Sequence, residues 1–236
     1  LNSRFYQENF TNGVGFSLSA GFIYKPTNTF RFGLSYQSPT WFTEIIENTN
    51  IINNDGFFGD TEIEVSNSDV IYDNTFGGNL PIQELLYKLR TPSKITASTA
   101  IIFGKVGLIS FDYSTNNYKG LYLSGDNFSQ ENLFFDNQLK RADAIRLGSE
   151  WRINNLSVRG GYVYEQSPFI NSISSDNLES YSLGLGYNFG NVKLNLSYRK
   201  SNKTDQYDFY PQYSEVEATQ LNINNTIITI GFSANI

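Results

Sequence analysis

The stretch Lys140–Pro168, KRADAIRLGSEWRINNLSVRGGYVYEQSP, places charged and large apolar residues at alternate positions. One register of its first half holds Arg146 and Glu150. The other register holds Leu147 and Trp151. Alternation with a period of two is the signature of a β-strand that has two different faces. The stretch therefore predicts two antiparallel strands joined at the tripeptide INN, with one apolar face and one face that carries arginine and glutamate.

The same alternation recurs along the 236-residue chain, and it predicts nine strands. Their connections are of two kinds. The short ones, PTN, GK, INN and GN, suit tight hairpins. The long ones are polar, at about 48–92, 119–138, 166–179 and 201–221. Short turns at one end and long loops at the other are typical of an outer-membrane barrel. The nine predicted strands are 15–25, 29–38, 94–103, 106–115, 140–151, 156–165, 180–189, 192–200 and 226–236.

Aromatic residues favour lipid as the surroundings of the apolar face. The chain contains 16 Tyr, 19 Phe and 2 Trp. Several lie near strand ends, where membrane barrels carry interfacial aromatic girdles: Tyr24, Tyr36, Trp151, Tyr187 and Phe189. The alternative is a soluble β-sandwich, in which the apolar face packs on a second sheet and the charged face meets water. We expect an all-β fold, an antiparallel transmembrane β-barrel that is integral to the bacterial outer membrane of a Gram-negative cell.

Nine strands do not complete such a barrel. Bacterial single-chain barrels have even strand numbers, and an open edge leaves backbone groups unpaired in hydrocarbon. We therefore expect residues 1–236 to form a single domain that is the C-terminal portion of a barrel. The remaining strands are expected before Leu1 or in another chain.

Composition argues against most enzymatic and nucleic-acid functions. The chain has no cysteine and no histidine, which removes disulfides, thiolate sites and every Ser–His nucleophile pair. The net charge of −6 and the lack of a basic stripe argue against nucleic-acid partners. We expect no catalytic residues, no metal site and no cofactor.

Three stretches resemble the C-terminal part of FadL/TodX-type outer-membrane transporters, a family for long-chain fatty acids or aromatic hydrocarbons. They are GVGFSLSAGFIYKPTNTFRFGLSYQSP (13–39), RTPSKITASTAIIFGKVGLISFDYSTNNY (90–118) and DAIRLGSEWRINNLSVRGGYVYEQSP (143–168). The resemblance implies a fourteen-stranded barrel with an N-terminal hatch, of which this chain supplies about nine strands. It also implies passive uptake of hydrophobic small molecules. Another branch of the same fold serves Bacteroidetes protein secretion, so an accessory subunit of an outer-membrane complex stays an alternative. A general porin is a further alternative.

The longest predicted loop contains a candidate surface for substrate capture. In NLPIQELLYKL (79–89), apolar residues at i, i+3, i+4 and i+7 and a proline in the first turn predict a short amphipathic helix. The resemblance implies that this loop helps to form a greasy groove on the extracellular side. The alternative is that these side chains only pack the loop onto the barrel rim. The candidate capture residues are Phe57, Phe58, Ile82, Leu85 and Leu86.

Cations in the inward register are the candidate ligands for a substrate carboxylate. A charge-assisted hydrogen bond from such a cation can hold a fatty acid in a partly desolvated lumen. The resemblance places a lysine close to the pocket at Lys140. The alternative is that these cations pair with Glu150, Glu165 and Asp112 inside the lumen. The candidate ligand-binding residues are Lys140, Arg146, Arg159 and Arg31. Membrane lipid and lipopolysaccharide are the expected surroundings.

Overall fold

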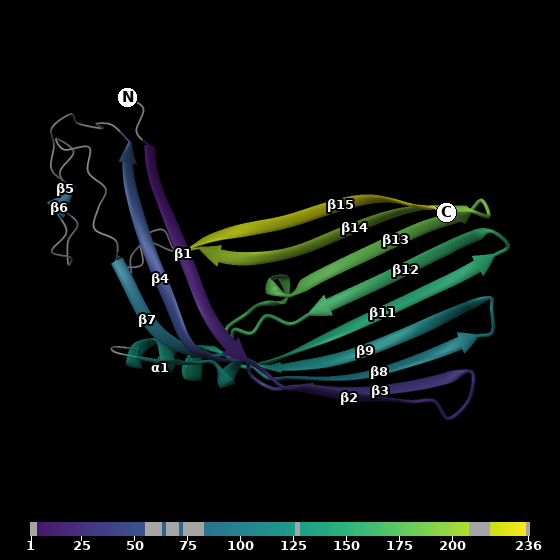
Figure 1. Ribbon diagram of the computed structural model, residues 1–236, viewed down its shortest axis with the longest axis horizontal. Coiled ribbons are helices and arrows are strands. Elements are labelled where there is room, and N and C mark those ends of the chain that lie inside the picture. Colours follow the sequence, from purple (N-terminus) through teal and green to yellow (C-terminus); the bar gives the residue numbers. More distant parts are fainter. Residues whose placement is uncertain are drawn as a thin grey trace. The chain divides into compact units, whose positions relative to one another are not determined.

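The computed structural model contains a nine-stranded antiparallel sheet in the predicted order (Figure 1). The structure describes residues 4–54, 63–64, 71–72, 83–125, 128–207 and 218–234. Every strand of the sheet pairs with the next one along the chain, apart from intervening segments that form a second sheet. The strands are β2 (Ser19–Tyr24), β3 (Phe30–Gln37), β8 (Lys94–Phe103), β9 (Gly107–Asn117), β11 (Arg141–Ile153), β12 (Leu156–Glu165), β13 (Leu178–Asn188), β14 (Val192–Tyr207) and β15 (Thr219–Ala234).

The predicted register is confirmed on these strands. On β13, Leu183 is 67% exposed, whereas Ser180 on the opposite face is only 6% exposed. Gly148 pairs with both Ser110 and Gly161, so small inward residues lie side by side across three strands. The sheet is the wall of an antiparallel β-barrel with its large apolar side chains outside. Among the described strands it remains open, because β2 and β15 have a neighbour on one side only.

The short connections are tight turns, as predicted. Asn154, Gly104 and Gly190 have positive φ values of 56°, 57° and 96°. Such values let a few residues reverse the chain between paired strands. All these hairpins lie at the same end of the nine-stranded sheet (Figure 1).

A second sheet of four strands lies in segments that the sequence predicts mainly as loop. Its order is β1-β4-β7-β10, and a two-stranded pair, β5 (Ile63–Glu64) and β6 (Ile71–Tyr72), stands apart from it. The prediction of one polar loop over 48–92 is therefore wrong for the described residues. The four strands are β1 (Arg4–Phe16), β4 (Trp41–Asn54), β7 (Gln83–Arg90) and β10 (Tyr122–Ser124).

The predicted helix over 79–89 is also wrong for its described part. Residues 83–90 form β7, which pairs with β4 on one side and β10 on the other. Leu85 and Leu89 are four residues apart, a spacing that suits one side of a strand as well as one face of a helix. Pairing with β4 along the strand and with β10 at residues 88–90 supplies backbone hydrogen bonds to β7, and this outweighs the local preference for a helix.

The helices of the described part of the chain are short, and none is long and apolar enough to span a membrane. They are α1 (Ser129–Gln138), η2 (Tyr118–Gly120) and η3 (Ser174–Asp176). α1 replaces part of the loop predicted at 119–138. The loop predicted at 201–221 is also shorter than expected, because β14 continues to Tyr207 and β15 begins at Thr219.

The chain divides into two compact units, each described here by itself. The wall unit carries the nine-stranded sheet, and the small unit carries the four-stranded sheet. The wall unit comprises Ser17–Pro39, Thr91–Leu121 and Leu133–Ile236, and the small unit comprises Leu1–Phe16, Thr40–Arg90 and Tyr122–Asn132.

Candidate functional site

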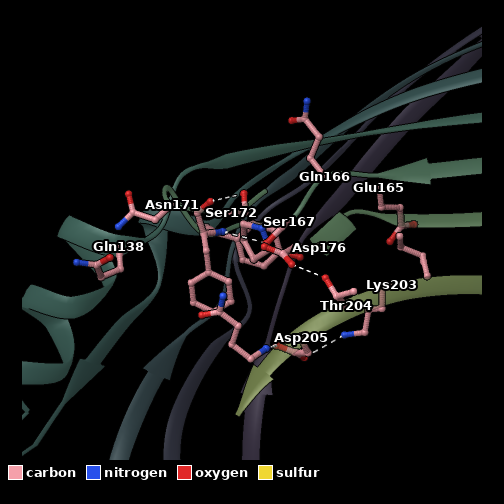
Figure 2. Close-up of a pocket in the computed structure, with 15 residues that line it drawn as sticks. Gln138, Glu165, Gln166, Ser167, Asn171, Ser172, Asp176, Lys203, Thr204 and Asp205 are labelled. Carbon is pink, nitrogen blue, oxygen red and sulfur yellow. Dashed lines mark hydrogen bonds and ion pairs between the residues drawn. The ribbon is translucent and has the colours of Figure 1, made fainter. Parts of the chain in front are cut away.

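The wall unit contains a cavity of about 660 Å³ at the end of the sheet opposite the tight hairpins, and Figure 2 shows the residues that line it. Its lining comes from the end of α1, from the segment 166–177 between β12 and β13, and from the last residues of β14. Gln138 and Asn171 lie on one side, and Lys203, Thr204 and Asp205 lie on β14 (Figure 2). The volume is within the range of small-molecule sites in proteins.

Backbone hydrogen bonds hold the segment 166–177 against the end of α1 and the start of β11. Leu139 and Phe169 form an isolated antiparallel bridge. The amide of Lys140 donates to the carbonyl of Pro168, and the amide of Ile170 donates to the carbonyl of Gln138, both at 2.8 Å. The segment is therefore anchored as a short continuation of the sheet rather than as a free loop.

The carboxylates that line the cavity all have partners. Asp205 pairs with Lys203 at 3.4 Å, and Glu165 pairs with Arg146. Asp176 accepts hydrogen bonds from the Thr204 hydroxyl and from a backbone amide. Because each carboxylate already has a hydrogen-bond or ion-pair partner, these groups stabilise the wall of the cavity and are poor candidates for binding a charged ligand.

An exposed apolar patch lies beside the cavity. We call it the rim patch: Leu133, Phe134, Phe169 and Ile170, which are 44–59% exposed. The rings of Phe134 and Phe169 meet edge to face, with centroids 6.5 Å apart. Phe169 also lines the cavity, so the patch is continuous with it. The sequence prediction missed these residues, although LFF (133–135) and FI (169–170) are apolar runs inside segments predicted as polar loops.

Arg146 lies on the inner face of the wall and is already paired. Its guanidinium pairs with Glu165 and donates to the Ser114 hydroxyl at 3.1 Å. Ser114 is wholly buried, so this contact fixes the arginine against the sheet. Arg146 therefore follows the predicted alternative, in which the inward cations pair with carboxylates of the same face.

Arg159 is paired in the same way, closer to the hairpin end. Its Nε lies 3.1 Å from Glu150, and its Nη1 donates to the Asn195 side chain at 3.0 Å. Glu150 also pairs with Arg152 at 2.8 Å. One carboxylate thus serves two guanidiniums. Asp112, the third predicted partner, makes no ion pair within the described ranges.

Lys140 and Arg31, the other two candidates, differ from this pair. Lys140 donates from Nζ to the Ser172 hydroxyl at 3.2 Å, and Ser172 lines the cavity. Arg31 lies exposed on β3, with no hydrogen bond or ion pair to the described residues. Neither cation has a carboxylate partner in the part of the chain that the structure describes. They are the two candidates whose charge is open to a ligand.

Of the candidate capture residues, Leu85 and Leu86 lie on β7 in the small unit. They are 45% and 57% exposed. Their neighbour Tyr87 donates to Glu47 at 3.2 Å, and burial together with this hydrogen bond raises the pKa of its phenol. Phe57, Phe58 and Ile82 lie outside the described residues.

Solved structures share the fold of this chain. CymD, described as a monoaromatic hydrocarbon channel, superposes with a TM-score of 0.51 at 16% identity, over 96% of this chain and 56% of that one. The toluene transporter TodX of P. putida gives 0.55 at 13% identity, over 94% and 49%. A FadL homologue of Pseudomonas aeruginosa gives 0.59 at 12% identity, over 92% and 51%. No protein-family model and no curated protein matches the sequence.

These comparisons confirm the predicted resemblance at the level of fold. The chain has the fold of part of a FadL/TodX-type barrel, and it spans about half the length of those proteins. Sequence identities of 12–16% support a shared fold only, and they do not show a shared substrate.

Proposed function

We propose that this chain is part of an integral barrel of the bacterial outer membrane that passively takes up hydrophobic small molecules. Long-chain fatty acids and aromatic hydrocarbons are the substrate classes. The observation that carries the proposal is a wall with an apolar outside, a polar inside, and an exposed aromatic patch continuous with a cavity at its loop end. Its partners are the substrate, membrane lipid and lipopolysaccharide.

The proposed path has three stages. The rim patch receives the apolar substrate from the extracellular side, because burying exposed aromatic surface is favourable. The cavity then leads towards the inner face of the wall. There a substrate carboxylate is held by a cation that has no carboxylate partner, which favours Lys140 and Arg31 over Arg146 and Arg159.

Uptake by living cells tests this function. A strain without the full-length gene should accumulate a radiolabelled long-chain fatty acid or toluene more slowly than its parent. The wild-type gene should restore uptake. Phe169→Ser should restore it only in part, whereas the matched Ile153→Ser, at an exposed hairpin end, should restore it fully. Unchanged uptake of all such compounds in the deletion strain would remove the proposal.

Two outcomes would point to the alternatives. A large partner that co-purifies in equal amount, with no effect of deletion on uptake, would favour an accessory subunit of a secretion complex. A large and steady conductance in planar bilayers would favour a general porin.

A further inference from the structure

The cavity of the wall unit is lined mainly by uncharged hydrogen-bonding groups. Its lining includes the side-chain amides of Gln138, Asn171 and Gln206, none of which has a hydrogen-bond partner among the described residues. The hydroxyls of Ser172 and Thr204 lie in the same lining. A primary amide offers two donors and one acceptor, so three of them leave much unused hydrogen-bonding capacity in one cavity.

The charges around the cavity balance. Glu165 is matched by Arg146, and Asp205 is matched by Lys203. The third carboxylate, Asp176, makes no ion pair among the described residues and is held by hydrogen bonds, while Lys140, whose ammonium bonds to the cavity-lining Ser172, supplies the third positive charge near the cavity. A net charge near zero gives neither an anion nor a cation a strong advantage here.

A bare hydrocarbon does not complement this lining either. It would strip water from the free amides and replace none of their hydrogen bonds, which costs free energy for each group. A ligand that suits the cavity is therefore neutral and carries several hydroxyl groups. Two aromatic residues, Tyr118 and Phe169, also line it and provide apolar ring surface. Polar groups for hydroxyls together with ring surface for C–H groups fit a sugar ring.

We propose that the cavity binds the saccharide head of a neutral amphiphile, while the rim patch receives its alkyl tail. Phe169 belongs to both surfaces and joins the two parts of the site. The head is placed by the amides of Gln138 and Asn171 on one side and by the end of β14 on the other (Figure 2). The rim patch and the cavity are the same as in the proposed function, and the inference adds the class of ligand that the cavity lining recognises.

Binding to the full-length protein in lipid nanodiscs tests the inference, with octyl glucoside and octanoate as probes below their micellar concentrations. Octyl glucoside should bind more tightly than octanoate, which has a similar tail and a charged head. The double variant Gln138→Leu/Asn171→Leu should weaken octyl glucoside binding by about tenfold and leave octanoate binding unchanged. The matched variant Asn155→Leu, at an exposed hairpin turn, should bind both probes as the wild type does.

One further variant tests the contribution of the tail, and one further measurement tests whether the native ligand is lipopolysaccharide. Phe134→Ser should weaken both probes, because it removes tail surface only. Lipopolysaccharide that co-purifies with the wild type and is lost from the double variant would identify the saccharide as that of the surrounding membrane. An unchanged amount would exclude lipopolysaccharide as the occupant of the cavity and leave a diffusing glycoside.

Equal binding of octyl glucoside and octanoate to the wild type would overturn the inference. So would undiminished binding of octyl glucoside to the double variant. Both results leave the uptake of fatty acids and toluene untouched, so this failure is distinct from failure of the proposed function.

Discussion

The wall unit and the small unit are built from adjacent stretches of chain, yet only one of them shows a clear pattern in the sequence. Two residues separate β1 from β2, and three residues separate β3 from β4 and β7 from β8. In the wall unit one register is mainly apolar along the central part of each strand, as in Leu183, Leu185 and Tyr187 of β13. In β4 it is not, since the run TEIIEN (43–48) puts two isoleucines side by side between acidic residues.

The difference reflects what each sheet has to face. A strand with lipid on one side must keep most of its outward positions apolar, so the sequence shows a period of two. A strand without lipid on one side has no such requirement, and the pattern of β4 is of this kind. Register also shifts in the small unit, between Val14 and Gly15 and between Phe42 and Ile45. Such irregularities further blur the alternation.

The largest expected effect comes from placing a charge in the lipid-facing register of the wall. Leu196 is 45% exposed in the middle of the apolar face of β14. We expect Leu196→Arg to destabilise the folded barrel by about 2–4 kcal/mol. Urea unfolding of the full-length protein in lipid vesicles measures the loss.

Two control variants test whether the damage depends on where the new charge lies, on the apolar face of the wall, on its inner face or in the small unit. Ser197→Arg is the next residue and faces inward, so it should cost far less. Leu86 in the small unit is 57% exposed, and Leu86→Arg should change stability by less than about 0.5 kcal/mol. If Leu86→Arg were as damaging as Leu196→Arg, the two sheets would share one environment and the contrast would fail.

The contrast also explains how much of the fold could be predicted from the sequence. The nine wall strands, their order and their tight turns follow from alternation and from residues such as Gly104 and Asn154. The break between β1 and β2 at Ser17 and Leu18 does not follow from the alternation. It depends on a distant residue, Ser38, whose hydroxyl accepts a hydrogen bond from the amide of Leu18 at 2.9 Å. β7 was predicted as helix because a spacing of four residues fits both structures.

The candidate site was predictable only in part. Register alone placed Arg146 and Arg159 on the inner face, but their partners Ser114 and Asn195 come from strands far along the chain. The cavity depends on how the segment 166–177 folds back on α1, which no local pattern encodes. The rim patch arises from the same long-range contact. Whether Lys140 or Arg31 binds a substrate stays a prediction.

The next expected effect concerns the carboxylate shared by two guanidiniums. Glu150→Gln leaves Arg159 and Arg152 without their counter-charge on the inner face. We expect a loss of about 1–2 kcal/mol, because Arg159 keeps Asn195 and Arg152 is largely solvated. The same unfolding assay applies, with Glu131→Gln on the exposed helix α1 as the matched control. A wild-type stability for Glu150→Gln would show that the pair contributes nothing.

A smaller effect distinguishes two glycines that flank Asn195 on neighbouring strands. A Cβ on Gly186 would lie 2.6 Å from the Asn195 side-chain oxygen, whereas one on Gly231 would lie 3.8 Å from its Cβ. Gly186→Ala should therefore displace the amide that holds Arg159 and cost about 1 kcal/mol. Gly231→Ala should be neutral within about 0.5 kcal/mol. Equal stabilities of the two variants would mean that Asn195 moves aside freely.

The smallest effect lies in the small unit, at the hydrogen bond from Tyr87 to Glu47. Tyr87→Phe should cost about 0.5 kcal/mol at neutral pH, because the pair is partly exposed. Burial raises the folded-state pKa of Tyr87 above its ordinary value of about 10. The advantage of the wild type is therefore fully present below that value and is lost as pH rises through the raised pKa. The difference between wild type and variant should shrink at strongly alkaline pH, measured as the hydrogen-exchange protection of β7 amides. A difference that grew with pH would mean that the phenolate is the stabilised form and that Glu47 is not its partner.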